Sequence, residues 1–166
     1  MSKKSSPLDG KPLMVALSVL TVAVAGSVRE VGAQTLNCAQ GIEYGTLAAC
    51  GVANTMTVEP DGGFTTSGCL TPIGNALPGT CILTGIVGTT VITAAGPGNL
   101  NNGGTGNMVI DGFLLQVTGN PTAVTLINVT PSMSNLNFSV GATLHVGAAQ
   151  AAGTYAGTYT INTNYP

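Results

Sequence analysis

Hydrophobic and polar residues alternate one by one through much of the chain after residue 33, a period of two that is typical of β-strands. The segment TMTVEP (55–60) puts Met56 and Val58 on one face and threonines on the other. The following PDGG (60–63) contains the residues that favour a tight turn. After residue 33 no stretch shows the i, i+3, i+4, i+7 spacing of a helix. We therefore expect a domain made of strands.

Further strands are expected downstream of this turn, separated by glycine, proline and asparagine. Residues 99–107, NLNNGGTGN, have the composition of a loop. Gly141 interrupts a long alternating segment, and we expect the strand to break there. About eight or nine short strands, with turn signals every 8–12 residues or so, predict an all-β antiparallel sandwich or barrel. The segments with strand character are 81–84, 89–94, 108–119, 122–130, 136–150 and 153–166.

The last of these segments, GTYAGTYTINTNYP (153–166), contains no charged residue. An uncharged strand at the edge of a sheet readily pairs with another chain. We expect it to be the last strand of the domain, paired with the first, and to form contacts between copies. The residues predicted for this contact strand are Tyr155, Tyr159, Ile161, Thr163 and Tyr165.

The first 33 residues have the features of a secretory signal peptide. Three lysines precede the apolar run 12–26, and a small-x-small pattern ends at Ala33. A membrane-spanning helix needs roughly 20 apolar residues, so we expect cleavage after Ala33 and no membrane insertion of the product. The predicted organisation is a signal peptide over 1–33 and one β-sandwich domain over 34–166. The protein is then exported through the periplasm and is secreted or held at the cell surface.

Charge narrows the range of partners. All lysine and arginine residues of the chain lie within 1–33, and residues 34–166 contain only Glu43, Glu59, Asp61 and Asp111 as acidic residues. Nucleic acid is excluded as a partner, because binding to phosphates needs basic side chains. Anionic membrane surfaces are disfavoured for the same reason. The exported domain also lacks the lysines that often protect sheet edges from pairing.

Four cysteines, Cys38, Cys50, Cys69 and Cys81, predict two disulfides in an exported domain. Three pairings are open. Equal spacings of twelve residues favour Cys38–Cys50 and Cys69–Cys81, each closing a local loop. A zinc site is disfavoured, because the chain has no C-x-x-C pair and its single histidine, His145, lies far from the cysteines.

The sequence offers little for catalysis. His145 lies between two apolar residues of an alternating segment, so we expect it to face solvent. Glu59 and Asp61 flank a turn proline and read as solvated carboxylates, and a calcium loop usually supplies more oxygen ligands. Glu43 and Asp111 could form a carboxylate pair for glycoside chemistry, but nothing fixes their separation. We predict no enzyme, no cofactor and no metal site.

Four pieces of the chain carry a family resemblance: IEYGTLAA (42–49), TMTVEPDGG (55–63), NMVIDGF (107–113) and VGATLHVGAAQAAGTYAGTYTINTNY (140–165). In this order they resemble a bacterial exported family catalogued as domain of unknown function 4402. A more distant similarity is to spore-coat-U-type and archaic chaperone–usher pilins. This resemblance implies an immunoglobulin-like sandwich, often surface-associated or polymeric, exported with a periplasmic chaperone and an outer-membrane usher, and without a known active site.

One feature departs from the pilins, which carry a long N-terminal arm that completes the sheet of a neighbouring subunit. Only Gln34 to Asn37 precede Cys38 here. We therefore expect a structural subunit of a surface fibre, pilus or layer that forms a homopolymer by pairing strand edges. The alternative is a monomeric secreted adhesin or ligand-binding module that uses loops such as Asn99–Asn107.

Overall fold

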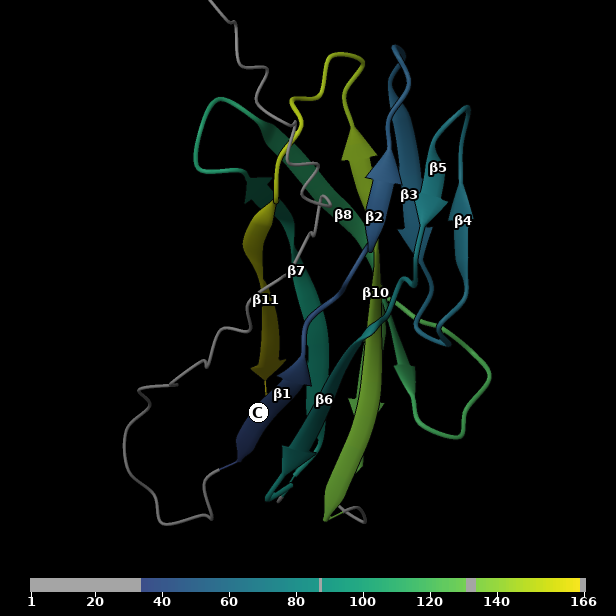
Figure 1. The fold of residues 1–166 in the computed structure, drawn as a ribbon. Helices are drawn as coiled ribbons and strands as arrows, with labels where there is room; N and C mark the ends of the chain where they lie inside the picture. Colours follow the sequence, from purple (N-terminus) through teal and green to yellow (C-terminus); the bar gives the residue numbers. More distant parts are fainter. Residues whose placement is uncertain (1–33, 87, 131–133, 165–166) are drawn as a thin grey trace, which may run out of the picture.

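The computed structural model describes residues 34–86, 88–130 and 134–164, which form eleven β-strands and no helix (Figure 1). The predicted signal peptide (1–33) and Tyr165 lie outside the described residues. Within the described ranges there is no helix long and apolar enough to cross a membrane. The strands are β1 Thr35–Gln40, β2 Thr46–Ala48, β3 Asn54–Val58, β4 Phe64–Thr66, β5 Thr71–Ile73, β6 Gly79–Thr84, β7 Thr90–Asn101, β8 Asn107–Val117, β9 Leu126–Val129, β10 Asn135–Val146 and β11 Ala156–Asn164.

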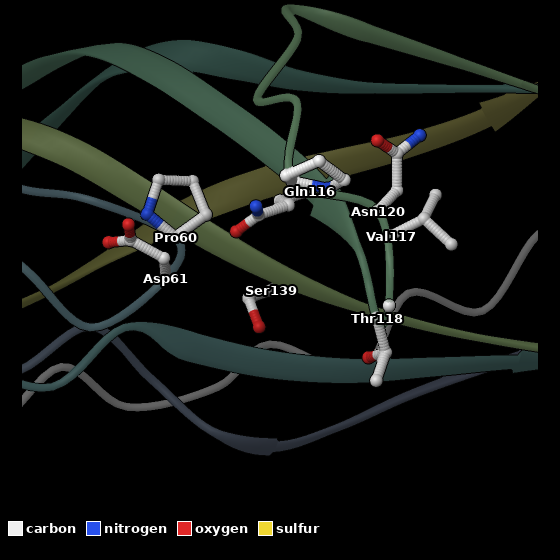
Figure 2. Close-up of a pocket in the computed structure, with 9 residues that line it drawn as sticks. Pro60, Asp61, Gln116, Val117, Thr118, Asn120 and Ser139 are labelled. Carbon is white, nitrogen blue, oxygen red and sulfur yellow. The ribbon is translucent and has the colours of Figure 1, made fainter.

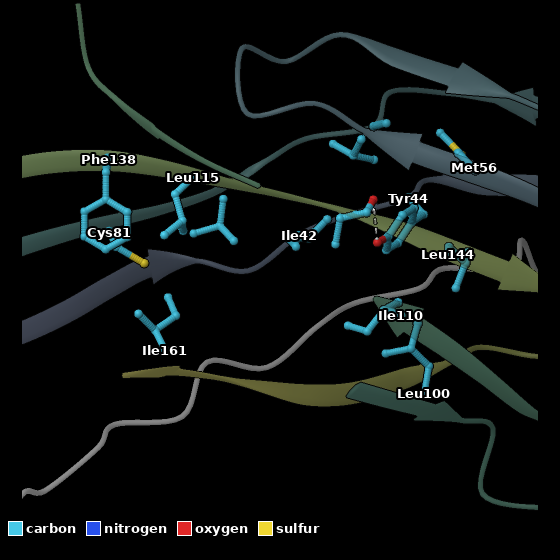
Figure 3. Packing of buried hydrophobic residues seen from close by; sticks show 14 of the residues in the cluster. Ile42, Tyr44, Met56, Cys81, Leu100, Ile110, Leu115, Phe138, Leu144 and Ile161 are labelled. Carbon is cyan, nitrogen blue, oxygen red and sulfur yellow. Dashed lines mark hydrogen bonds between the residues drawn. The ribbon is translucent and has the colours of Figure 1, made fainter. Parts of the chain in front are cut away.

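The long strands form an antiparallel path in the order β1-β6-β10-β8-β7-β11. β3 pairs with the second half of β10 and carries β4, whereas β9 pairs with the first part of β7. β2 and β5 form a separate two-stranded sheet. The path folds over a shared core, in which Phe138 from β10 and Ile161 from β11 point toward one another (Figure 3). The predicted all-β antiparallel sandwich is confirmed.

The buried faces of β3 and β10 match the alternation of apolar and polar residues in the sequence. In β3, Met56 and Val58 are fully buried, as expected. In β10 every second residue is at most 4% exposed, which buries one complete face of the strand. These residues are Leu136, Phe138, Val140, Ala142, Leu144 and Val146.

Gly141 does not break this strand, and that expectation is wrong. β10 runs without interruption through Gly141, where a Cβ atom would collide with the carbonyl oxygen of Val58. The glycine is therefore needed for close approach of β3. The irregularity lies in β8 opposite, where the pairing shifts around Gly112, which has φ +59°. Such a bulge reverses which residues of the strand face inward: Ile110 is buried before it and Leu115 after it.

Two other expectations about the strands need correction. The predicted loop 99–107 is shorter than expected: residues 99–101 belong to β7 and Asn107 begins β8, because Leu100 is fully buried and pairs with Met108, and only residues 102–106 lie between the two strands. The closing strand pairs with β7 and not with the first strand, which pairs with β6. Alternation fits any neighbouring strand equally, so it could not identify the partner. The short strands β2, β4 and β5 have three residues each, too few to show a period.

Candidate functional site

The path of strands ends in two edges that have no partner among the described residues. β1 pairs only with β6, and β11 pairs only with β7. We call these the β1 edge (Thr35–Gln40) and the β11 edge (Ala156–Asn164). Neither segment contains a charged residue or a proline, the residues that most often protect an edge. Both edges lie on the same side of the molecule, at the left of Figure 1.

Contacts at both ends of the edges place them alongside each other. Nε2 of Gln34, just before β1, donates a hydrogen bond to Oγ1 of Thr90 at 2.8 Å. Thr90 adjoins the β7 residue that pairs with Asn164, the end of β11. Near the start of β11, the hydroxyl of Tyr159 lies 2.6 Å from the position of a Cβ on Gly79 of β6. The start of β1 therefore lies near the end of β11, so the two edges run in opposite directions.

The side chains of β11 alternate as expected. Ile161 is 6% exposed, and Tyr159 and Thr163 are partly buried on the same face. Tyr159 contacts Phe113, with ring centroids 5.3 Å apart. Burial raises the pKa of Tyr159 to about 12. The structure therefore turns three of the predicted contact residues, Tyr159, Ile161 and Thr163, toward the core side of β11. The opposite face of the strand, which includes Thr158, is exposed.

Tyr155, which the sequence placed in the contact strand, precedes β11 and is fully buried. Its hydroxyl donates to the carbonyl of Ala151 at 2.6 Å and accepts from Nε2 of Gln150 at 2.6 Å. Nδ2 of Asn102 also donates to this hydroxyl, at 3.4 Å. The side chain is therefore a structural anchor for the start of β11 and is not available to a second copy.

The loop between β7 and β8 is held by its own side chains. Oδ1 of Asn102 accepts hydrogen bonds from the backbone N–H groups of Gly104 and Gly106, at 3.0 Å and 3.1 Å. Together with the bond to Tyr155, these contacts fix residues 102–106 against the segment before β11. The ligand-binding loop considered from the sequence is thus short and internally bonded.

The four cysteines form two disulfides, as predicted, but the predicted pairing is wrong. The bonds are Cys38–Cys81 and Cys50–Cys69. Cys38 and Cys81 stand opposite each other in the β1–β6 register, so the strand pairing brings them together across 43 residues. Equal spacing along the chain carries no information about such a register. The Cys38–Cys81 bond ties the β1 edge to the sheet.

His145 faces solvent, as predicted, and it has a partner that the sequence did not suggest. Its Nε2 lies 2.8 Å from Oδ1 of Asp111, and the two side chains are 46% and 49% exposed. The β8–β10 register pairs Asp111 with Thr143, two residues before His145, so only the register reveals the contact. In the described part of the chain no three His, Cys, Asp or Glu residues are grouped to hold a metal ion.

A surface depression at one end of β8 does not resemble a catalytic site (Figure 2). It has a volume of about 440 Å³ and lies between the β3–β4 turn, the end of β8 and Ser139 of β10. Asp61 is the only ionisable residue that lines it, and its Oδ1 already accepts a hydrogen bond from the N–H of Gly63 at 2.9 Å. A nucleophile paired with a base is therefore missing from this lining.

Comparison with known proteins gives one family. A family model described as Domain of unknown function (DUF4402) matches residues 34–165. No curated protein and no solved structure gives a match. The family part of the predicted resemblance is confirmed, and the matched range includes both unpaired edges.

Proposed function

The chain belongs to the DUF4402 family of domains of unknown function, and on that premise we propose that it is an exported structural subunit. Copies of it join through strand edges into a surface fibre, pilus or layer. The observation that carries the proposal is the pair of unpaired, uncharged edges, β1 and β11, on one side of the sandwich.

The free edges can bind another chain through the backbone. Along an edge strand the outward N–H and C=O groups have no partner in the sheet, and another strand can complete them. Each hydrogen bond gained contributes about 1 kcal/mol net, and β11 offers nine residues and β1 six. The alternating side chains of β11 determine the register, because a shift by one residue would exchange its two faces.

Export is part of the proposal. The two disulfides support it, because disulfides form and persist in oxidising compartments. The predicted signal peptide over 1–33 supports it from the sequence. A pilin-like relationship, with a periplasmic chaperone and an outer-membrane usher as partners during export, belongs to the same proposal and is supported by the sequence resemblance.

The mode of assembly differs from that of pilins with a donated N-terminal arm. Residues 35–40 already form β1 in their own domain, and Cys38 is bonded to Cys81. The residues before Cys38 therefore complete the sheet of their own copy. This favours pairing between folded edges over donation of an arm.

Electron microscopy of negatively stained, purified mature protein over a range of concentrations tests the proposal. We expect ordered assemblies of the native protein. Thr158→Lys places a charge on the β11 edge, and we expect discrete particles from this variant, because lysine on an edge opposes strand pairing. Thr80→Lys is the matched control: Thr80 is also exposed, but it lies in β6, which is paired on both sides.

Both substitutions are on the surface, so each should change the free energy of unfolding by no more than about 0.5 kcal/mol. Assembly by the control but not by the edge variant would support edge pairing. Discrete particles of the native protein at every concentration would refute assembly. Equal assembly by both variants would refute the role of the β11 edge.

A further inference from the structure

Gln34 precedes β1 directly, and its side-chain amide is bonded on one side only. Nε2 donates to Oγ1 of Thr90 at 2.8 Å. Oε1 is buried and receives no hydrogen bond from the described residues. A buried carbonyl oxygen without a donor is unfavourable. The position of Oε1 in the fold is therefore not stabilised by a hydrogen bond from the described residues.

We propose that Gln34 is a modification site, at which the N-terminal glutamine of the exported chain cyclises to pyroglutamate. The inference rests on the proposed function, in which cleavage after Ala33 makes Gln34 the first residue. The free α-amine then attacks Cδ of its own side chain. A bond forms between the α-nitrogen and Cδ, the Cδ–Nε2 bond breaks, and Nε2 leaves as ammonia with a proton from the amine. The step needs no oxidant, reductant or cofactor.

Cyclisation would change two polar contacts around Gln34. Ring closure draws the side-chain carbonyl back toward the main chain and removes Oε1 from its unsatisfied position. The reaction also removes the hydrogen bond from Nε2 to Oγ1 of Thr90, because Nε2 leaves as ammonia. Oγ1 of Thr90, a fully buried residue, keeps its own hydrogen bond to the carbonyl of Gly88 at 3.4 Å. The modification therefore exchanges one unsatisfied acceptor for one lost bond and leaves the Thr90 hydroxyl partnered.

The modification also changes the charge of the β1 edge. Residues 34–166 contain no lysine or arginine, so the α-ammonium group of Gln34 would be the only cation apart from protonated His145. It would lie at the start of the β1 edge, and β1, β6, β7 and β11 contain no carboxylate to pair with it. Cyclisation removes this terminal charge, in the way that other N-terminal modifications do. The edge then becomes neutral along its whole length, which favours strand pairing.

Mass spectrometry of the exported protein, purified from the producing cells, tests this inference. After reduction, a protease specific for glutamate releases the N-terminal peptide 34–43. We expect its mass to be lower by one ammonia than that of the free-amine peptide, and we expect pyroglutamyl aminopeptidase to remove its first residue. Gln34→Asn is the control variant, because its shorter side chain would have to close a four-membered ring, and we expect it to keep a free amine.

A synthetic peptide 34–43 carried through the same procedure measures cyclisation during handling, and we expect a higher cyclised fraction in the exported protein. Equal fractions, or a native peptide that begins at Gln34 with a free amine, would overturn the modification while leaving export and cleavage standing. A peptide that begins at another residue would overturn both the modification and the predicted cleavage site. Neither result bears on strand pairing, which the microscopy tests separately.

Discussion

Removal of the Cys38–Cys81 disulfide should destabilise the domain more than removal of Cys50–Cys69. The first bond closes a loop across 43 residues and the second across 19. In the chain-entropy model these loops correspond to about 4 and about 3 kcal/mol of stabilisation. Cys81 is also 5% exposed within the core, so truncation to alanine leaves a small cavity that costs about 1 kcal/mol more.

The expected losses are therefore about 5 kcal/mol for Cys38→Ala/Cys81→Ala and about 3 kcal/mol for Cys50→Ala/Cys69→Ala. A domain of this size has a free energy of unfolding of about 5–15 kcal/mol, so the first variant loses a large share of its stability. Urea unfolding followed by circular dichroism measures both losses. Hydrogen exchange should also show faster exchange in β1, since β1 pairs with only one other strand.

Three results would contradict this reasoning. An equal or larger loss in the Cys50/Cys69 variant would show that loop length and burial do not control the difference. Peptide mapping without reduction that found Cys38 linked to Cys50 would refute the connectivity itself. A correct connectivity with unchanged exchange in β1 would refute the role of the bond in holding this edge.

Three further predictions concern the packed interior. Gly141→Ala should destabilise the domain by about 1–3 kcal/mol, because the added methyl group collides with the Val58 carbonyl; an unchanged urea midpoint would contradict this. Burial raises the pKa of Tyr159 to about 12 and that of Tyr44 further above its usual value near 10. Both hydroxyls stay protonated in the folded state above pH 10, so stability should be complete below pH 10 and fall as the pH rises through 12. Tyr159→Phe should make urea midpoints less sensitive in this range, and an equal dependence would refute the assignment. Tyr155→Phe should cost about 1 kcal/mol by removing the hydrogen bond at 2.6 Å to a backbone carbonyl, which urea unfolding would detect, whereas a neutral result would show that the hydroxyl is not an anchor.

Much of the candidate site could be anticipated from local patterns. The uncharged closing strand and the exposure of His145 follow from composition and alternation. Ile161 was predicted to contact a second copy, but it lies on the buried face of β11. The partner of His145, by contrast, is Asp111 on another strand. The contact between these two side chains depends on the pairing of β8 with β10, whose register shifts at the bulge around Gly112. The buried state of Tyr155 was also missed, since one aromatic residue before a strand looks the same whether it packs inward or faces a second copy.

The sequence by itself determined that the domain consists of strands, which faces of β3 and β10 are buried, and that the cysteines are oxidised. These properties depend on the side chains of each segment, because a period of two fixes the inward and outward residues wherever the strand lies. The tertiary structure decided which strands are neighbours, that Cys38 bonds to Cys81, and that β1 and β11 are left as free edges. Backbone hydrogen bonds are chemically alike in every strand, so only the packing of the whole chain over one core selects the partners.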